Sequence, residues 1–221
     1  KVIEEAPPPF ISDATRKAMG EQAVALAKAV KYQSAGTVEF VVGKDQSFYF
    51  LEMNTRLQVE HPVTECITGL DLVEWMIRIA AGEPLTLKQE DVQRNGWAIE
   101  CRINAEDPVT FMPSPGTVTH FFMPNGSGVR FDSHLYPNYA IPTFYDSLIG
   151  KLICHGQTRE QAIAKLRHAL DELIITGIKT NVPLHRDVIL QDQAFCKQAQ
   201  NIHYLEKNLL SQPDASKTET E

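Results

Sequence analysis

The sequence lacks the features that mark several large classes of protein. Its four cysteines lie far apart and form no C-x-x-C pair, which favours neither a zinc site nor a small disulfide scaffold. No apolar run approaches the ~18 residues of a membrane-spanning helix, and the first residues lack the apolar core of a signal peptide. No strongly basic run is present, and the net charge of -7 argues against binding nucleic acid by electrostatics alone. We therefore expect a reducing compartment, no membrane partner and no nucleic-acid partner.

The composition that is present is that of an ordinary globular protein. Of the 221 residues, 43% are hydrophobic and 22% are charged, so the chain can bury a core. It opens on Lys1 without a methionine, which favours a segment of a longer chain. The length allows two domains, and the polar, turn-rich stretch 83–95 predicts the boundary between them.

The part before this boundary predicts helices packed on an antiparallel sheet. A helix is expected over 12–31, with Ser12 as its N-cap. Two short apolar strands, 37–42 and 47–53, flank a polar turn and predict a β-hairpin. A second helix is expected over 70–81, where apolar residues recur at helical spacing.

The part after the boundary predicts short strands followed by helices. Apolar and polar residues alternate over 97–104, which predicts a half-buried strand with a polar face. Further strands are expected at 116–122, 128–133 and 147–155, and further helices from Thr158, at 183–190 and at 203–210. The polar tail from Ser211 is expected to be disordered. The whole pattern is of the α+β class.

The hairpin brings acidic residues together. If it closes through a four-residue loop, Glu39 lies about opposite Glu52, and Asn54 lies two residues further along the same face. Facing carboxylates repel unless a cation lies between them. Carboxylate and amide oxygens suit Mg²⁺ or Mn²⁺, with phosphate oxygens and water completing the coordination. The pattern predicts a metal site for nucleoside triphosphate chemistry; the alternative is two solvated glutamates on an exposed sheet face.

Three further polar residues follow the second hairpin strand. The planar fork of Arg56 suits a carboxylate, carbonate or phosphate group. Gln58 adds hydrogen-bond donors, and Glu60 is a candidate general base. Next to a metal–phosphate site, this layout favours activation of a carboxylate-like substrate by phosphorylation. The alternative is a surface salt bridge between Arg56 and Glu60.

These residues carry a resemblance to a known family. The run 50–57, Phe-Leu-Glu-Met-Asn-Thr-Arg-Leu, resembles the metal-binding signature of ATP-grasp ligases. The extension 58–65, Gln-Val-Glu-His-Pro-Val-Thr-Glu, resembles the biotin carboxylase family in particular. Further similar segments are 1–7, 100–108, 113–116, 145–152 and 177–181, so the resemblance runs from Lys1 to about Asn208.

The resemblance implies two domains and a tail. Residues 1–88 would form the C-terminal half of an ATP-grasp domain, an antiparallel sheet with packed helices. Residues 96–208 would form the biotin carboxylase C-terminal domain, also an antiparallel sheet with helices, and 211–221 a disordered tail. The glycine-rich loop that covers phosphates in this family is absent from these residues, so the chain is expected to bind ATP weakly and turn over negligibly by itself.

The resemblance also implies a site for ATP and its metal ions. Glu39, Glu52 and Asn54 would hold two Mg²⁺ or Mn²⁺ ions against the phosphates of ATP. Val41 would line the adenine pocket, with core packing as the alternative explanation of this residue.

A bicarbonate site is implied beside the ATP site. Arg56, Gln58 and the backbone N–H of Val59 would hold bicarbonate, with Lys1 nearby, and Glu60 would deprotonate it. Attack on the γ-phosphate would give carboxyphosphate, which releases CO₂ beside biotin on a carrier protein.

Two residues are implied for biotin. Arg102 would stabilise the biotin enolate, because a fixed cation contributes most where oxyanion charge develops in a dehydrated site. The alternative is an ordinary salt-bridge partner on a strand. Asp146 would lie near the biotin pocket.

The resemblance implies several partners. These are biotin carboxyl carrier protein, the carboxyltransferase subunits of an acetyl-CoA carboxylase of fatty acid biosynthesis or a propionyl-CoA carboxylase, and a second copy of the complete enzyme. Arg130 lies in a segment similar to a dimer contact, where Ser127 replaces an expected aromatic residue. The implied location is the bacterial cytoplasm, or the mitochondrial matrix in a eukaryote. The alternatives are another ATP-grasp ligase, such as a carbamoyl-phosphate synthetase segment, and a non-catalytic assembly module.

Overall fold

A computed structural model describes residues 1–198 and 200–209, and its mixture of helices and antiparallel sheets confirms the α+β prediction. The tail expected at 211–221 lies outside the described residues. The strands are β1 (Ile3–Ala6), β2 (Thr37–Val42), β3 (Phe48–Asn54), β4 (Trp97–Asn104), β5 (His120–Phe122), β6 (Val129–Ser133), β7 (Leu148–Gly156) and β8 (Ile174–Thr176). The helices are α1 (Asp13–Ala29), α2 (His61–Thr68), α3 (Leu72–Ala80), α4 (Arg159–Glu172) and α5 (Gln193–Lys197), with short helical turns η1 (Gln89–Asp91), η2 (Leu184–Val188), η3 (Ile189–Gln191) and η4 (Leu205–Leu209).

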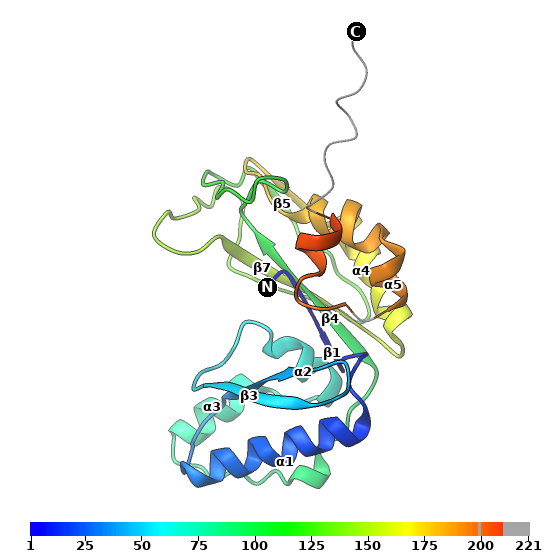
Figure 1. Cartoon of the computed structure of the whole chain (residues 1–221). Coiled ribbons are helices and arrows are strands. Elements are labelled where there is room, and N and C mark those ends of the chain that lie inside the picture. Colours follow the sequence, from blue (N-terminus) through cyan, green and yellow to red (C-terminus); the bar gives the residue numbers. More distant parts are fainter. Residues whose placement is uncertain (199, 210–221) are drawn as a thin grey trace.

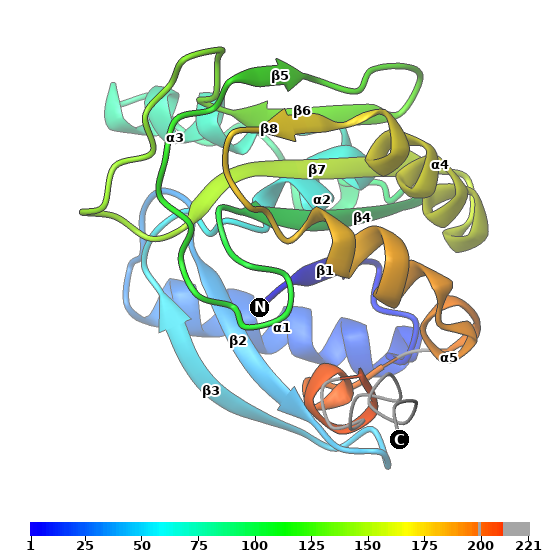
Figure 2. The same cartoon turned by 90° about the horizontal axis from the view of Figure 1, so that it is seen from above.

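The elements form two lobes joined by β1. Figure 1 shows α1, α3 and the β2–β3 hairpin in one lobe and β4, β7, α4 and α5 in the other, with β1 running between them. The main sheet is antiparallel with the strand order β1-β4-β7-β6 (Figure 2). Strand β1 was not predicted, and it places the first residues of the chain in the same sheet as β4. The division into domains 1–88 and 96–208 stays a prediction.

Strand β4 is buried on both faces. Ile99, Cys101 and Ile103 belong to the core that also contains Leu166 of α4. On the other face, Ala98 packs with Val63 and Ile67 of α2. The predicted strand and its polar residues are confirmed, but the expected half-burial is wrong: Glu100, on the polar face, is 0% exposed because helix α2 and the turn before it cover this side. The positions of the strand's two ends agree with the prediction.

The hairpin pairs as predicted. Glu39 lies directly opposite Glu52, with an irregularity in the ladder after Glu39. The turn closes where the N–H of Gly43 donates to the carbonyl of Ser47 at 2.7 Å. Helix α1 runs alongside the hairpin in both views (Figures 1 and 2).

The helices near the hairpin agree only partly with the sequence predictions. The Ser12 hydroxyl accepts a hydrogen bond from the N–H of Thr15 at 3.1 Å, which confirms the predicted N-cap. The predicted helix at 70–81 is α3, capped by Asp71. Helix α2 was not predicted. It begins immediately after Glu60 and ends at Gly69, whose φ of 71° lies in the left-handed region that favours glycine.

The C-terminal elements also agree only partly with the sequence predictions. Thr158 accepts from the N–H of Gln161 at the start of α4, as predicted. The predicted helix at 183–190 is two short turns, η2 and η3, and within the predicted 203–210 the structure describes η4. Strand β8 and helix α5 were not predicted. Of the helices in residues 1–198 and 200–209, none combines the length and the apolar character that a membrane span requires.

Candidate active site

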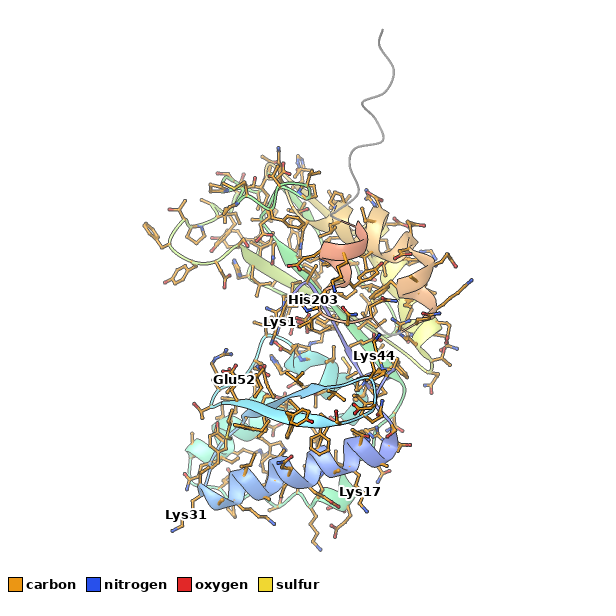
Figure 3. All side chains as sticks on the ribbon, viewed as in Figure 1. Lys1, Lys17, Lys31, Lys44, Glu52 and His203 are labelled. Carbon is orange, nitrogen blue, oxygen red and sulfur yellow. The ribbon has the colours of Figure 1, made fainter. Side chains whose placement is uncertain are left out.

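The side chain of Glu60 is the meeting point of three segments that are distant in the sequence. Its Oε1 accepts a hydrogen bond from Lys1 Nζ at 2.7 Å, and its Oε2 accepts one from Arg102 Nη2 at 2.9 Å. Lys1 precedes β1, Arg102 lies on β4, and Glu60 is the N-cap of α2. Figure 3 shows Lys1 at the junction of the two lobes, above the hairpin end that carries Glu52. The fold thus places two predicted site residues, Lys1 and Arg102, around the carboxylate of a third, Glu60.

Arg102 is fixed by a second carboxylate. Its Nε donates to Oε1 of Glu4 at 2.7 Å, from the strand paired with β4. With 16% of its side chain exposed, the guanidinium is held between Glu4 and Glu60. Arg102 is therefore a salt-bridge partner, the alternative stated above. It is also a fixed and partly desolvated cation, which the implied role in oxyanion stabilisation requires.

The hairpin carboxylates lie beside this cluster. Nδ2 of Asn54 donates to Glu39 at 2.9 Å and, more weakly, to Glu52 at 3.4 Å. Glu39 also accepts from Gln58 Nε2 at 2.6 Å, and its carboxylate lies 3.6 Å from Lys1 Nζ. Glu39 thereby connects the predicted metal ligands with the group around Glu60.

The donor set fits a divalent cation that takes its other ligands from a substrate. In the described part of the chain, no group of three or more His, Cys, Asp or Glu residues could hold a metal ion by itself. Glu39 and Glu52 supply two carboxylates, and Asn54 supplies an amide whose oxygen is placed toward Arg56. Rotation of this amide by 180° would present its oxygen to the side of the two carboxylates. Such a site suits a hard ion that keeps phosphate oxygens and water.

The Arg56 side chain is exposed. Its guanidinium donates to the Leu57 carbonyl at 3.3 Å and to Asn54 Oδ1 at 3.4 Å. Within the described residues, the ion pairs of Glu60 go to Lys1 and Arg102, so the alternative of an Arg56–Glu60 salt bridge is wrong. Among the residues that the structure describes, the fork of Arg56 forms two long hydrogen bonds, so it can turn toward an anion.

Charges around Glu60 favour its ionised form. Burial alone would raise the pKa of Glu60, but the Lys1 hydrogen bond and the charges of Lys1 and Arg102 outweigh it and lower that pKa. The same hydrogen bond raises the pKa of Lys1 against its partial burial. Burial raises the pKa of Glu4, against the opposing effect of Arg102. Glu60 is therefore a carboxylate at neutral pH and able to accept a proton.

The carbonyl of Val59 is hydrogen-bonded, and its N–H is available to a ligand. Its carbonyl accepts from Lys151 Nζ at 3.0 Å. Its N–H donates no hydrogen bond within the part of the chain that the structure describes. Val59 and Lys151 also line a surface cavity of about 340 Å³. An anion bound to the Val59 N–H is compatible with this arrangement.

Two predicted residues lie apart from the cluster. Asp146 accepts from the N–H of Leu148 at 3.0 Å and lines a cavity of about 210 Å³ with His134. Among the described residues, no contact joins Asp146 to Arg102. Val41 is 55% exposed, so core packing does not explain it in this chain.

Three charged residues beside the site were not predicted from the sequence. Glu4, Glu100 and Lys151 lie on the strands that carry or flank Arg102. In the part of the chain described, neither carboxylate oxygen of Glu100 has a hydrogen-bond partner. For Glu100 the available signal was its place between the apolar residues Ile99 and Cys101, which the alternating pattern assigned to a polar face. The predicted dimer residue Arg130 pairs within the chain, with Glu65 and Asp132, each at 2.7 Å.

The comparisons with known proteins agree with this architecture. Residues 1–88 match the family described as carbamoyl-phosphate synthase L chain, ATP binding domain. Residues 100–207 match the biotin carboxylase C-terminal domain. The chain is 57% identical to the biotin carboxylase of Pseudomonas aeruginosa over 209 residues, which is 95% of this chain and 46% of that protein. It is 55% identical to the human mitochondrial propionyl-CoA carboxylase alpha chain, over 87% of this chain and 27% of that one.

Solved structures give the same result. A biotin carboxylase from Campylobacter jejuni, in a complex described as biotin carboxylase-beta-gamma-ATP, superimposes with a TM-score of 0.89 at 47% identity, covering 93% of this chain and 46% of that one. The biotin carboxylase domain dimer of Hydrogenobacter thermophilus 2-oxoglutarate carboxylase, solved with MgADP, ADP and bicarbonate, gives 0.90 at 46% identity with the same coverage. The fold is that of ATP-grasp biotin carboxylase structures, and the chain spans about half the length of the bacterial biotin carboxylases that it matches.

Proposed function

Since the chain belongs to the biotin carboxylase family, we propose that it carries the bicarbonate-activating and biotin-binding residues of an ATP-dependent biotin carboxylase. The observation that carries this proposal is the carboxylate of Glu60, held between Lys1 at 2.7 Å and Arg102 at 2.9 Å. A base that is ionised and flanked by two cations can take a proton from an anion that those cations attract. The reaction is proposed for the complete protein, because the chain covers 46% of the bacterial relative.

In the first step, bicarbonate binds at the turn between β3 and α2. Arg56, Gln58 and the N–H of Val59 supply donors to the anion, and Lys1 adds a positive charge. Glu60 accepts the bicarbonate proton while an oxygen of the anion attacks the γ-phosphorus of ATP. The bond from that phosphorus to ADP breaks, which gives carboxyphosphate and ADP. Bicarbonate bound to the Hydrogenobacter domain supports this assignment.

In the second step, carboxyphosphate separates into CO₂ and phosphate. The phosphate takes the proton from the ureido nitrogen of biotin, and that nitrogen then forms the bond to CO₂. Arg102 stabilises the negative charge on the biotin oxygen, since its guanidinium is already fixed by Glu4 and needs little reorganisation. Asp146 is proposed to lie at the edge of the biotin pocket.

The hairpin is proposed to hold the metal ions of the ATP site. Glu39, Glu52 and Asn54 would bind two Mg²⁺ or Mn²⁺ ions, which neutralise charge on the phosphates when bound. Val41, exposed on β2, would line the adenine pocket. MgADP in the Hydrogenobacter domain supports magnesium in particular.

The partners are proposed from the same relatives. The biotin would be carried by a biotin carboxyl carrier protein and then used by carboxyltransferase subunits, whose acyl-CoA is acetyl-CoA or propionyl-CoA. A homodimer is proposed on the example of the Hydrogenobacter domain dimer. Fatty acid biosynthesis in a bacterial cytoplasm is the setting we propose, with the mitochondrial matrix as the eukaryotic counterpart.

The test measures ATP cleavage by the complete protein as a function of bicarbonate, with and without biotin. We expect cleavage to depend on bicarbonate and to increase with biotin. In the Arg56→Ala variant, we expect kcat/KM for bicarbonate to fall by about 10²-fold or more, because a bidentate cationic donor is lost. Arg78→Ala is the matched control, since Arg78 is an exposed arginine that pairs with Glu74 on α3.

Two results would contradict the proposal. Unchanged carboxylation in Arg56→Ala would remove the bicarbonate assignment. Bicarbonate-dependent cleavage that biotin does not stimulate would favour another ATP-grasp ligase, such as a carbamoyl-phosphate synthetase. The match of residues 100–207 to the biotin carboxylase C-terminal domain is the observation against that alternative.

A further inference from the structure

A row of charged residues lies beneath the turn that carries Val59 and Glu60. Lys151 of β7 pairs with Arg102 of β4 on one side and with Asp132 of β6 on the other. Polar groups in the middle of a covered sheet cost free energy, so each needs a partner. Arg102 is paired with Glu4 and Glu60, so the question is which group compensates the buried charge of Lys151.

Lys151 contacts the backbone of the site. Only 14% of its side chain is exposed, and its Nζ donates to the carbonyl of Val59 at 3.0 Å. Its ion pair with Asp132 spans 3.9 Å, a distance too long for a hydrogen bond. The Val59 carbonyl belongs to the peptide group that joins Val59 to Glu60. The ammonium group therefore holds the peptide from which the general base extends.

We propose that Lys151 is a positioning residue for bicarbonate activation, which fixes the Val59–Glu60 peptide so that the Val59 N–H and the Glu60 carboxylate face the same anion. This proposal rests on the proposed function. It extends that function to a strand that does not touch the substrate. The energetic reason is that small displacements of a catalytic group, of about 1 Å, reduce rates by up to ~10²-fold.

The charges around Lys151 are compatible with this role. Asp132 and Arg130 face it from β6, Glu100 and Arg102 from β4, and Glu65 from α2. Burial lowers the pKa of Lys151, while the charges of Glu100 and Asp132 oppose that shift. The amine donates a hydrogen bond to the Val59 carbonyl whether it is charged or neutral, so the contact does not depend on its titration.

The test compares three variants of the complete protein. Lys151→Met keeps the aliphatic stem and removes the donor, and Lys151→Arg keeps a donor. Lys165→Met is the matched control: Lys165 Nζ makes a similar bond, at 2.9 Å to the carbonyl of His155, near the far end of β7. The readouts are KM for bicarbonate and for ATP, and amide hydrogen exchange in the peptide 57–64, where the N–H of His61 donates to the Gln58 carbonyl.

We expect Lys151→Met to raise KM for bicarbonate by about ten- to a hundredfold and to leave KM for ATP within about twofold. Exchange in the peptide 57–64 should become faster. Lys151→Arg should recover part of both effects, and Lys165→Met should change neither. If Lys151→Met does not fold, the same two readouts on Lys151→Arg decide, because a misplaced donor should still raise KM for bicarbonate selectively.

Three outcomes overturn the inference or separate it from the proposed function. Exchange that is unchanged in Lys151→Met overturns the positioning role. An equal rise in both KM values also overturns it, because a general loss of structure would act on both substrates. A wild-type protein whose ATP cleavage ignores bicarbonate overturns the proposed function instead, and the exchange measurement alone then decides whether Lys151 positions the turn.

Discussion

At the scale of single residues, Glu100 shows how a carboxyl group is accommodated in a central strand. It is fully buried, and its cross-strand neighbour on β1 is a second carboxyl group, Glu4. Burial and the charge of Glu4 raise the pKa of Glu100 to about 8, against the opposing charges of Lys151 and Arg102. Glu100 is therefore mainly protonated at neutral pH, which reduces the cost of burying it.

This shift predicts how stability changes with pH. The ordinary pKa of the carboxyl group is 4.5 and the folded value is about 8, so between them the folded state binds one more proton than the unfolded state. Its contribution to stability is complete below 4.5 and is lost as pH rises through 8. Glu100→Gln lacks this dependence. From pH 5 to 8 its free energy of unfolding, relative to wild type, should rise by up to about 1.4 kcal/mol per pH unit.

Urea unfolding at a series of pH values measures this difference. Glu21→Gln, at an exposed position on α1, is the control and should run parallel to wild type. A Glu100→Gln curve that is also parallel to wild type would show that Glu100 is ionised in the folded protein throughout this range.

At the scale of elements, helix α2 connects the hairpin with the main sheet. Val63 and Ile67 of α2 pack on Ala98 and Ile153, and its first turn follows Glu60 directly. The position of the proposed general base, Glu60, therefore depends on apolar packing one and two turns further along the same helix. The same face of the main sheet is apolar near Ala98, where α2 packs, and charged near Arg102, which pairs with Glu60.

Truncating this contact should weaken the protein. Ile67 is 6% exposed, and Ile67→Ala should lower the free energy of unfolding by about 2–5 kcal/mol, through lost burial and the cavity that remains. Ile77→Ala is the matched control: Ile77 is on the neighbouring helix α3, is 66% exposed and should change stability by less than about 0.5 kcal/mol. Chemical denaturation of both variants measures this. Similar losses in the two would mean that α2 does not depend on its contact with the sheet.

The elements also show what the sequence could predict. The hairpin was predictable because its apolar residues and polar turn are local, and the facing of Glu39 and Glu52 followed from it. The N-caps Ser12 and Thr158 are equally local signals. Helix α2 was missed because it has only eight residues and its N-cap, Glu60, makes no side-chain capping bond, so the capping signal of a helix start is absent. The burial of Glu100 could not be predicted, since alternation does not reveal which face another element covers.

At the scale of the whole molecule, β1 assembles the site. Lys1 and Glu4 reach Glu60 and Arg102 only because this four-residue strand pairs with β4. A strand of four residues is too short for its sequence pattern to reveal which distant strand it pairs with. The resemblance to biotin carboxylases grouped Lys1 with Glu60, but the physical reason for their proximity is visible only in the fold.

A buried ion pair holds the other end of β1. Arg159, at the start of α4, donates to Glu5 at 2.7 Å and to the carbonyls of Phe195 and Cys196 at 3.0 and 2.9 Å. Glu5 also accepts from the indole N–H of Trp97 at 2.9 Å. The side chains of Arg159 and Glu5 are 9% and 18% exposed, so removal of either partner leaves a charge that water solvates only in part.

This pair predicts a coupled pattern of stability losses. Arg159→Met should destabilise the protein by about 3–5 kcal/mol, because Glu5 and two carbonyls lose their donor. The double variant Arg159→Met with Glu5→Gln should lose less than the sum of the single variants, since the uncompensated charge is gone. Arg186→Met is the control, because Arg186 forms an exposed pair with Asp187. Thermal unfolding of the wild type, the two single variants and the double variant gives a double-mutant cycle, which measures the coupling between Arg159 and Glu5. Strictly additive losses would show that Arg159 and Glu5 act independently, and the ion pair would then not hold β1 to α4.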